Sequence, residues 1–403
     1  MAGLSVRGSY PLAILFLKKG FFQMESYLIK TRRALHEIPE VGFDLDRTLA
    51  FVKGELDAMG VGYDESYGRS SLVAYLGKEN AGRTLAIRAD MDALPIGEEN
   101  DLPYKSKREG FMHACGHDAH TAIALDTVRR LKAVENSLTC SVRVLFQSAE
   151  EHSTSGAKLM ADDGAMDGVD MIVALHVDPT YDVGCVGISK GRQNAISYGF
   201  YLNFYGKSVH VAKQPEGIDA IRMAAEAYVR INALTDEFRA EGKQIIFGIG
   251  KIEGGTTNNI VCDKCRLFGT VRSIDESECE DFDRRMKAIL EEVAKSYGGK
   301  AELTPVKFYP LVINDDEVTA RAKKTLDGML CPECIIYKKP DMIGEDFAYL
   351  LKKAPGCMIR LGIRNESLGI TNLLHTTKFN IDENALAIGS DFFVNFVLNN
   401  MNG

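Results

Sequence analysis

The chain has 403 residues, and at roughly 150 residues per domain this length predicts two or three domains and excludes a small disulfide-stapled scaffold. Hydrophobic residues make up 45% and charged residues 26%, as in ordinary soluble globular proteins and unlike disordered or fibrous chains. The 48 basic and 56 acidic residues give a net charge of -8, which argues against a broad nucleic-acid-binding face and favours small-molecule chemistry.

An apolar segment at residues 10–17 lies between Arg7 and Lys18. It is too short to span a bilayer, and it is followed by Lys-Lys-Gly-Phe-Phe where a signal peptide has a small-residue cleavage site. We interpret residues 1–23 as a leader that is not part of the fold. Since no other apolar run approaches the length of a membrane span, we expect a cytoplasmic protein without a membrane partner.

The first part of the fold, residues 24–190, alternates between helical and strand-like patterns. Pro39 ends the first helix and Gly60 follows the second. Alternating strands and helices predict an α/β layer with a largely parallel sheet. In chain order we expect helices at 26–38 and 47–59, strands at 71–76 and 84–89, a helix at 121–134, a strand at 141–147, a helix at 155–162 and a strand at 171–175.

The pattern changes near residue 191 and returns after residue 310. Between them we expect a strand at 196–205, a helix at 217–234, strands at 244–252 and 260–273, a helix at 277–297 and a strand at 300–308. This β-α-β-β-α-β order is ferredoxin-like, and its sheet would leave one face free for dimerisation. Beyond it we expect a helix at 316–330, a strand at 358–362 and a helix at 383–398.

The predicted fold class is therefore α/β, with a mainly parallel-sheet metal-binding domain split by an inserted ferredoxin-like α+β domain. The catalytic domain comprises 24–190 and 310–403, and the inserted lid or dimerisation domain comprises 191–309.

Nine cysteines form an odd set that does not read as a disulfide framework, so a reducing compartment is expected. Two pairs have metal-type CxxC spacing, Cys262 with Cys265 and Cys331 with Cys334. Residues 266–330 separate them, far more than the roughly 15–20 residues that zinc ribbons use. We therefore do not expect a structural zinc site.

Histidines are concentrated between His113 and His120, where Cys115 and His117 flank a glycine at the start of a predicted helix. A thiolate and an imidazole in such a turn suit zinc or a similar transition metal. The alternative is a helix N-terminus that happens to be rich in histidine.

Further ligands should follow other predicted strands, because ligands gather where the strands of an open parallel sheet end. Neighbouring residues in an extended segment point in opposite directions, so one of two adjacent glutamates could bind metal while the other addresses a water. Alone, such a pair is usually a solvated surface, and a lone histidine is usually packed. The candidates at these positions are Asp90 and Asp92, Glu150 and Glu151, His176, and His375.

Seven motifs carry a resemblance that runs in order from about residue 26 to 398. They are 33–40 (RALHEIPE), 87–95 (IRADMDALP), 113–120 (HACGHDAH), 149–151 (AEE), 174–176 (ALH), 344–347 (GEDF) and His375. Together they resemble the amidohydrolase branch of the M20 metallopeptidases, which includes N-acyl-amino-acid amidohydrolases, hippurate hydrolases and auxin-conjugate hydrolases.

The resemblance implies two divalent metal ions (Zn, Mn, Co or Ni), with Cys115 bridging them. Glu150 would be the general base and Asp92 would orient the metal site, while Asp90 occupies a ligand position in other M20 branches and its role here stays open. The implied metal ligands are Cys115, His117, Glu151, His176 and His375.

In the inserted domain, His210 matches a histidine that reaches across a dimer to the substrate carbonyl. Asn259 and Arg272 match lid residues that contact substrate polar groups or a carboxylate. The resemblance thus implies a homodimer formed through the inserted domain.

The implied activity is metal-dependent hydrolysis of the amide bond of N-acyl-amino acids or related small conjugates. An M20-type dipeptidase or aminopeptidase is the alternative, and a non-catalytic metal-binding protein is a weaker one. A hydrolase using Cys115 as nucleophile with His117 as base would have poor geometry at this spacing. Departures from the family pattern leave the acyl group and amino acid open; they are Ser148, His152-Ser-Thr154, Gln214-Pro215 and Asn259-Ile-Val-Cys262.

Overall fold

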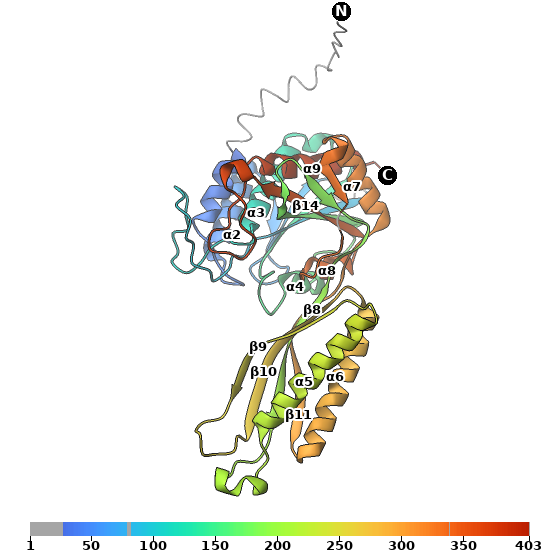
Figure 1. Ribbon diagram of the computed structural model, residues 1–403. Helices are drawn as coiled ribbons and strands as arrows, with labels where there is room; N and C mark the ends of the chain where they lie inside the picture. The colour runs from blue at the N-terminus through green and yellow to red at the C-terminus, as the bar shows by residue number, and fades with distance from the viewer. Residues whose placement is uncertain (1–26, 79–81, 338, 403) are drawn as a thin grey trace, which may run out of the picture.

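The computed structural model describes residues 27–78, 82–337 and 339–402, so the predicted leader lies outside the described residues. Figure 1 shows a broad α/β domain joined to an elongated domain that extends away from it. In the described part of the chain, no helix combines the length and apolar character needed to cross a membrane.

An eight-stranded sheet forms the centre of the large domain, in the order β1-β2-β4-β3-β5-β14-β6-β13. The four adjacent strands β4, β3, β5 and β14 are mutually parallel, which confirms the predicted parallel sheet. The strands are β1 (Tyr63–Asp64), β2 (Leu72–Gly77), β3 (Thr84–Asp90), β4 (Ser141–Gln147), β5 (Met171–Asp182), β6 (Val186–Ile188), β13 (Ile335–Tyr337) and β14 (Gly356–Arg364).

Helices cover both faces of this sheet, as a parallel sheet requires. Along β3, Leu85 and Ile87 pack into one hydrophobic cluster while Ala86 packs into the cluster on the opposite face. The first cluster includes α2 (Asp46–Met59), α3 (His117–Ala133), α7 (Asp316–Asp327) and α9 (Ala385–Asn400), and the second includes α4 (Gly156–Asp162) and α8 (Phe347–Leu351). Residues 27–36 form a further helix.

The inserted domain has the predicted β-α-β-β-α-β order and an antiparallel sheet in the order β11-β8-β10-β9. Its core packs α5 and α6 against one face, and on the other face Phe268 and Val306 are 37% and 41% exposed. Its elements are β8 (Ile196–Tyr205), α5 (Ala220–Ala240), β9 (Ile245–Gly254), β10 (Lys264–Ser273), α6 (Glu276–Tyr297) and β11 (Lys300–Tyr309).

The chain enters and leaves the inserted domain through two paired strands, β7 (Gly191–Asn194) and β12 (Val312–Asn314). Residues 191–194 therefore belong to the junction, and the inserted sheet begins at Ile196. Short strands such as β6, β7, β12 and β13 were not predicted, because three or four residues show no clear periodicity. The single-turn helices are η1 (Glu135–Ser137), η2 (Val211–Glu216), η3 (Pro332–Cys334) and η4 (Glu366–Leu368).

Candidate active site

The predicted ligands meet at one edge of the large sheet. Glu150 and Glu151 follow the end of β4, and His176 lies within β5, which runs seven residues further than the predicted strand. Cys115 and His117 stand at the start of α3, which begins at His117 and not at residue 121 as expected. Side chains from well-separated parts of the chain thus converge, as expected at the carboxyl ends of parallel strands.

Cys115 stands at the centre of the candidate ligands. Its Sγ lies 3.5 Å from Nε2 of His176 and 3.4 Å from Nε2 of His375. Nε2 of His375 lies 2.9 Å from Oε1 of Glu151. The ligand atoms of Cys115, His117 and His176 lie within 4.8 Å of one another, and so do those of Cys115, Glu151 and His375. These two triads share the sulfur of Cys115, and together they are a donor set that would hold two neighbouring cations.

The donor atoms also fit a metal chemically. Nε2 of His117 is buried and has no hydrogen-bond partner, which is costly unless a ligand takes its lone pair. Burial raises the pKa of the Cys115 thiol well above its usual range, a penalty that a coordinated cation would reverse by binding the thiolate. Thiolate, imidazole and carboxylate together match the predicted transition metals.

Three residues in the loops that carry the candidate ligands have positive φ angles. Gly116 has a φ of 84°, and a Cβ there would lie 2.4 Å from Cγ2 of Val177. Ala149 and His375 are non-glycine residues with φ of 54° and 60°. Such conformations persist where the surrounding structure imposes them, and they concentrate at functional sites.

Asp92 forms hydrogen bonds with three of the residues that surround the candidate metal site. Its Oδ1 accepts a hydrogen bond from the backbone N–H of Glu150 and its Oδ2 accepts one from that of Glu151, both at 3.0 Å. Its carbonyl oxygen lies 2.8 Å from Nδ1 of His117. If Nδ1–H donates to this carbonyl, Nε2 keeps its lone pair for a metal. Asp92 thus contacts the segments that carry Glu150, Glu151 and His117, and its positioning role stays a prediction.

Asp90 and His120, which also lie in the sequence motifs, form hydrogen bonds and ion pairs with other parts of the fold. Asp90 pairs with Nη1 of Arg88 at 2.6 Å and with Nδ1 of His120 at 2.5 Å. Although burial opposes ionisation, the charge of Arg88 holds the pKa of Asp90 well below its usual range. Nε2 of His120 accepts a hydrogen bond from the backbone of Val177 at 2.9 Å. These hydrogen bonds and ion pairs already occupy both side chains, although the donor atoms of Asp90, His117 and His120 also lie within 4.8 Å of one another.

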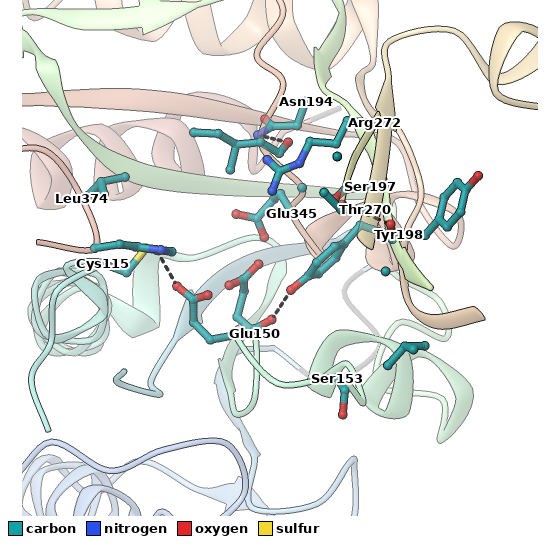
Figure 2. Close-up of a pocket in the computed structure, with 18 of the residues that line it drawn as sticks. Cys115, Glu150, Ser153, Asn194, Ser197, Tyr198, Thr270, Arg272, Glu345 and Leu374 are labelled. Atoms are coloured by element: carbon teal, nitrogen blue, oxygen red, sulfur yellow. Dashed lines mark hydrogen bonds and ion pairs between the residues drawn. The ribbon is translucent and has the colours of Figure 1, made fainter. Parts of the chain in front are cut away.

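Glu150 is a buried carboxyl, 6% exposed, that faces the site (Figure 2). Burial, together with the charges of Glu345 and Glu151, raises its pKa well above the usual range. The Tyr309 hydroxyl donates to its backbone carbonyl at 2.7 Å. A buried carboxyl whose pKa is raised suits a proton shuttle.

The site opens into a cavity of about 720 Å³ between the two domains. This is large enough for a small organic substrate. Arg272 lines it and donates from Nη1 to the carbonyl of Met342 at 2.8 Å, so the structure brings this predicted residue to the site. The inserted domain also contributes Tyr198 and Phe268 to the lining.

His210 and Asn259 are not brought to this cavity. His210 is exposed and follows β8, its Nδ1 accepts from the backbone of Ala212 at 3.1 Å, and the backbone of Val211 donates to the carbonyl of Asn259 at 2.9 Å. The two residues therefore share one end of the inserted domain, which extends away from the large domain in Figure 1.

Two other features of the sequence have structural explanations. His152 accepts a hydrogen bond from the backbone of Thr154 at 3.0 Å, which is a turn cap. Cys262 and Cys265 are buried in the core of the inserted domain, whereas Cys331 is exposed on the large domain. The two CxxC pairs thus lie in different domains.

Sequence reasoning missed Asn194, Glu345 and Arg360 as cavity residues. Arg360 is 4% exposed and lies in the middle of β14, whose neighbours are buried and apolar. An arginine within an otherwise apolar predicted strand was the available signal, since charged residues are almost never buried without a partner.

Comparison with known proteins agrees with this geometry. A family model described as peptidase family M20/M25/M40 matches residues 86–399. The chain belongs to this family. It is similar to thermostable carboxypeptidase 1 of Saccharolobus solfataricus, with 35% identity over 93% of the chain and 95% of that protein. It is also similar to the N-acetyl-L-cysteine deacetylase of Bacillus subtilis, with 33% identity over 96% of the chain and 94% of that protein.

Two solved structures of M20-like proteins resemble the whole chain. One is a putative aminohydrolase from methicillin-resistant Staphylococcus aureus, with a TM-score of 0.87, 30% identity, and coverage of 96% of this chain and 98% of that one. The other is a Bacillus subtilis protein described as a dinuclear metal binding peptidase of the M20 family, with a TM-score of 0.80, 29% identity, and coverage of 94% and 98%. The predicted family and fold are thereby confirmed, and the chain is a metal-dependent hydrolase of amide bonds.

Proposed function

We propose that this M20 hydrolase cleaves the amide bond of N-acyl-amino acids, releasing the free amino acid. The observation that carries the proposal is the convergence of two ligand triads on Cys115 beside the buried carboxyl of Glu150, at the base of a cavity of about 720 Å³. The similarity to an N-acetyl-L-cysteine deacetylase supports a small acyl group.

In this proposal, Cys115, His117, Glu151, His176 and His375 hold two divalent cations. When bound, such cations lower the pKa of water from 15.7 to about 7 and polarise the scissile carbonyl. The chain's own contribution is a donor set fixed by strained backbone and by the three hydrogen bonds of Asp92.

Glu150 then performs the proton transfers. Its carboxylate accepts a proton from the attacking water and returns it to the nitrogen of the leaving amine. Burial raises the pKa of Glu150, which favours its holding the proton between the two transfers. The guanidinium of Arg272, which lines the same cavity, would bind the α-carboxylate of the substrate.

A second copy of the chain would complete the site. Because His210 and Asn259 lie at the far end of the inserted domain, they can reach a substrate only in another subunit's cavity. We therefore propose a homodimer formed through the inserted domain, in which His210 stabilises the oxyanion. A mixture of inactive His210→Ala and Glu150→Gln proteins should recover part of the activity, because a mixed dimer contains one intact site.

Dipeptide hydrolysis is the second candidate, because a carboxypeptidase is among the relatives at 35% identity and the bond to be broken is the same.

A cytoplasmic location is proposed as well, since the nine cysteines are unpaired and suit a reducing compartment.

The test is amine release from N-acetyl- and N-benzoyl-amino acids and from dipeptides, with Zn, Mn, Co or Ni supplied in turn. Glu150→Gln should keep the wild-type metal content, measured by elemental analysis, and lose about 100-fold or more of kcat. Equal turnover by this variant would contradict the assignment of the base. Activity that survives chelation would instead indicate a thiol nucleophile at Cys115.

A further inference from the structure

Three arginines are buried among the described residues, namely Arg32, Arg88 and Arg360, with exposures of 0%, 1% and 4%. Nε of Arg32 lies 2.8 Å from a carboxylate oxygen of Asp118. Arg88 has ion pairs with three carboxylates, of which Asp90 is the closest at 2.6 Å. The first two buried cations are therefore neutralised within the fold.

Arg360 differs from these two. Its Nη2 donates to Oδ1 of Asn194 at 2.9 Å, and its buried Nε has no hydrogen-bond partner. It makes no ion pair with any carboxylate of the described chain. Burying a guanidinium without a negative partner is unfavourable, and a neutral amide oxygen compensates only part of the lost hydration.

Other acidic groups on neighbouring elements do not supply this partner. Burial raises the pKa of the Tyr181 phenol, the charges of Asp178 and Asp341 raise it further, and that of Arg360 opposes them, so all three charged groups act on this phenol. Neither carboxylate comes within the 4.0 Å that defines an ion pair with Arg360 in the described chain. Among the described residues Arg360 therefore has no ion-pair partner, and an anionic ligand would supply one.

The position of Arg360 indicates where that charge comes from. Arg360 on β14 is the direct cross-strand neighbour of His176 on β5, and it lines the catalytic cavity. Paired residues on adjacent strands lie side by side with their side chains on one face. The guanidinium is thus held next to a candidate metal ligand, facing the space that a substrate would fill.

A second guanidinium lines the same cavity. Asn194 donates from Nδ2 to the carbonyl of Ile343 at 3.1 Å, and Arg272 donates to the adjacent carbonyl, that of Met342. Figure 2 shows Asn194 and Arg272 on the side of the cavity opposite Glu150. If Arg272 takes the α-carboxylate, Arg360 is left to take another anionic group.

We infer that Arg360, oriented by Asn194, is the receptor for a second carboxylate of the substrate, so that the preferred substrates are N-acyl-amino acids with two carboxylates. The inference rests on the proposed function and specifies its substrate class. The second carboxylate is on either the amino-acid side chain or the acyl chain, and a guanidinium can bind it through two parallel hydrogen bonds.

The kinetic test uses two pairs of substrates that differ only by carboxylate against amide. N-acetyl-L-glutamate is compared with N-acetyl-L-glutamine, and N-succinyl-L-alanine with N-succinamyl-L-alanine. At least one acidic member should exceed its amide partner by about 10-fold or more in kcat/KM. The pair that shows the preference identifies the side of the amide bond that carries the second carboxylate.

The variant Arg360→Met should lower kcat/KM for the acidic member by about 10- to 100-fold, mainly through KM, and change the amide member by less than about 3-fold. Arg360→Lys should retain part of the preference. Equal losses on both members, or a wild-type preference for the amides in both pairs, would overturn the inference while leaving the proposed function intact. Failure to hydrolyse any N-acyl-amino acid would instead contradict the proposed function.

A stability measurement tests the inference without turnover. In the metal-free protein, Arg360→Met should raise the midpoint of thermal unfolding, because it removes an uncompensated buried charge. Arg88→Met is the matched control and should lower the midpoint, because it leaves three carboxylates unpaired. Adding glutarate should raise the midpoint of the wild type more than that of Arg360→Met. If Arg360→Met lowers the midpoint as Arg88→Met does, Arg360 is structural and the inference is wrong.

Discussion

Substitution of Gly116 by alanine tests how tightly the fold determines the position of the metal ligands. Gly116 lies between Cys115 and His117 with a φ of 84°, where an L-residue costs roughly 1–2 kcal/mol. The added Cβ would lie 2.4 Å from Cγ2 of Val177, and overpacking of this kind costs about 1–3 kcal/mol more. We therefore expect Gly116→Ala to reduce the free energy of unfolding by about 2–5 kcal/mol.

The matched control is Gly110→Ala. Gly110 has a φ of 79°, and a Cβ added there has nothing within 4 Å. Gly110→Ala therefore has the conformational cost of a positive φ without a steric clash. The double variant Gly116→Ala/Val177→Ala separates the two costs, because it removes the methyl group that the new Cβ meets. It should be more stable than the sum of the two single changes predicts, by about 1–3 kcal/mol.

Urea unfolding of the metal-free proteins measures these differences, and calorimetric titration with Zn reports the effect on metal binding. Gly116→Ala should bind Zn more weakly than Gly110→Ala, because the strain falls on the segment that joins two ligands. The reasoning is refuted if the two alanine variants are equally stable, or if Val177→Ala shows no coupling to Gly116→Ala.

Three further predictions concern positioning, metal and pH. Asp92→Ala should lower kcat and weaken metal binding together, measured by kinetics and elemental analysis, because the backbone amides of Glu150 and Glu151 lose their acceptor while the carbonyl that faces His117 remains. A change in kcat with full metal content would contradict this role. Chelation should lower the unfolding midpoint of the metal-loaded wild type by several degrees, and an unchanged midpoint would argue against a site formed by these ligands. Burial raises the pKa of Asp283 to about 6, above the value of about 3.9 in an unfolded chain. The folded state therefore binds this proton more tightly, and stability is lost as the pH rises from about 4 to 6. Asp283→Asn should remove that loss. The free energy of unfolding of the variant, relative to that of the wild type, should therefore increase by about 1 kcal/mol from pH 4.5 to pH 7.5, after allowance for solvent screening. A difference that does not change with pH would contradict the prediction.

Periodicity was sufficient to predict the inserted domain, because its strands and helices are long and each shows one buried face. It was insufficient at the junction, where β7 and β12 are defined by their pairing with each other. The strand that carries His176 was predicted too short, since polar residues at its far end are accommodated by pairing with β14.

The clustering of the candidate metal ligands was predictable, because cysteine, histidine and glutamate near the sheet edge have few other reasons to occur together. Arg360 was not predicted, because its importance depends on the absence of a carboxylate partner, which only the packed structure shows. The roles of His210 and Asn259 stay predictions, since one chain alone does not bring them to the cavity.

Because β7 pairs with β12, the inserted domain is a structural unit that could be deleted from the chain without disturbing the large domain. Its hydrophobic cluster is separate from the two clusters that support the large sheet, and the chain leaves the module beside the point where it entered. A short turn joining these strands would bypass the insertion without altering the register of β3, β4, β5 and β14. Evolution could thus exchange or reshape the insertion, and with it the choice of substrate, while the reactive groups kept their places.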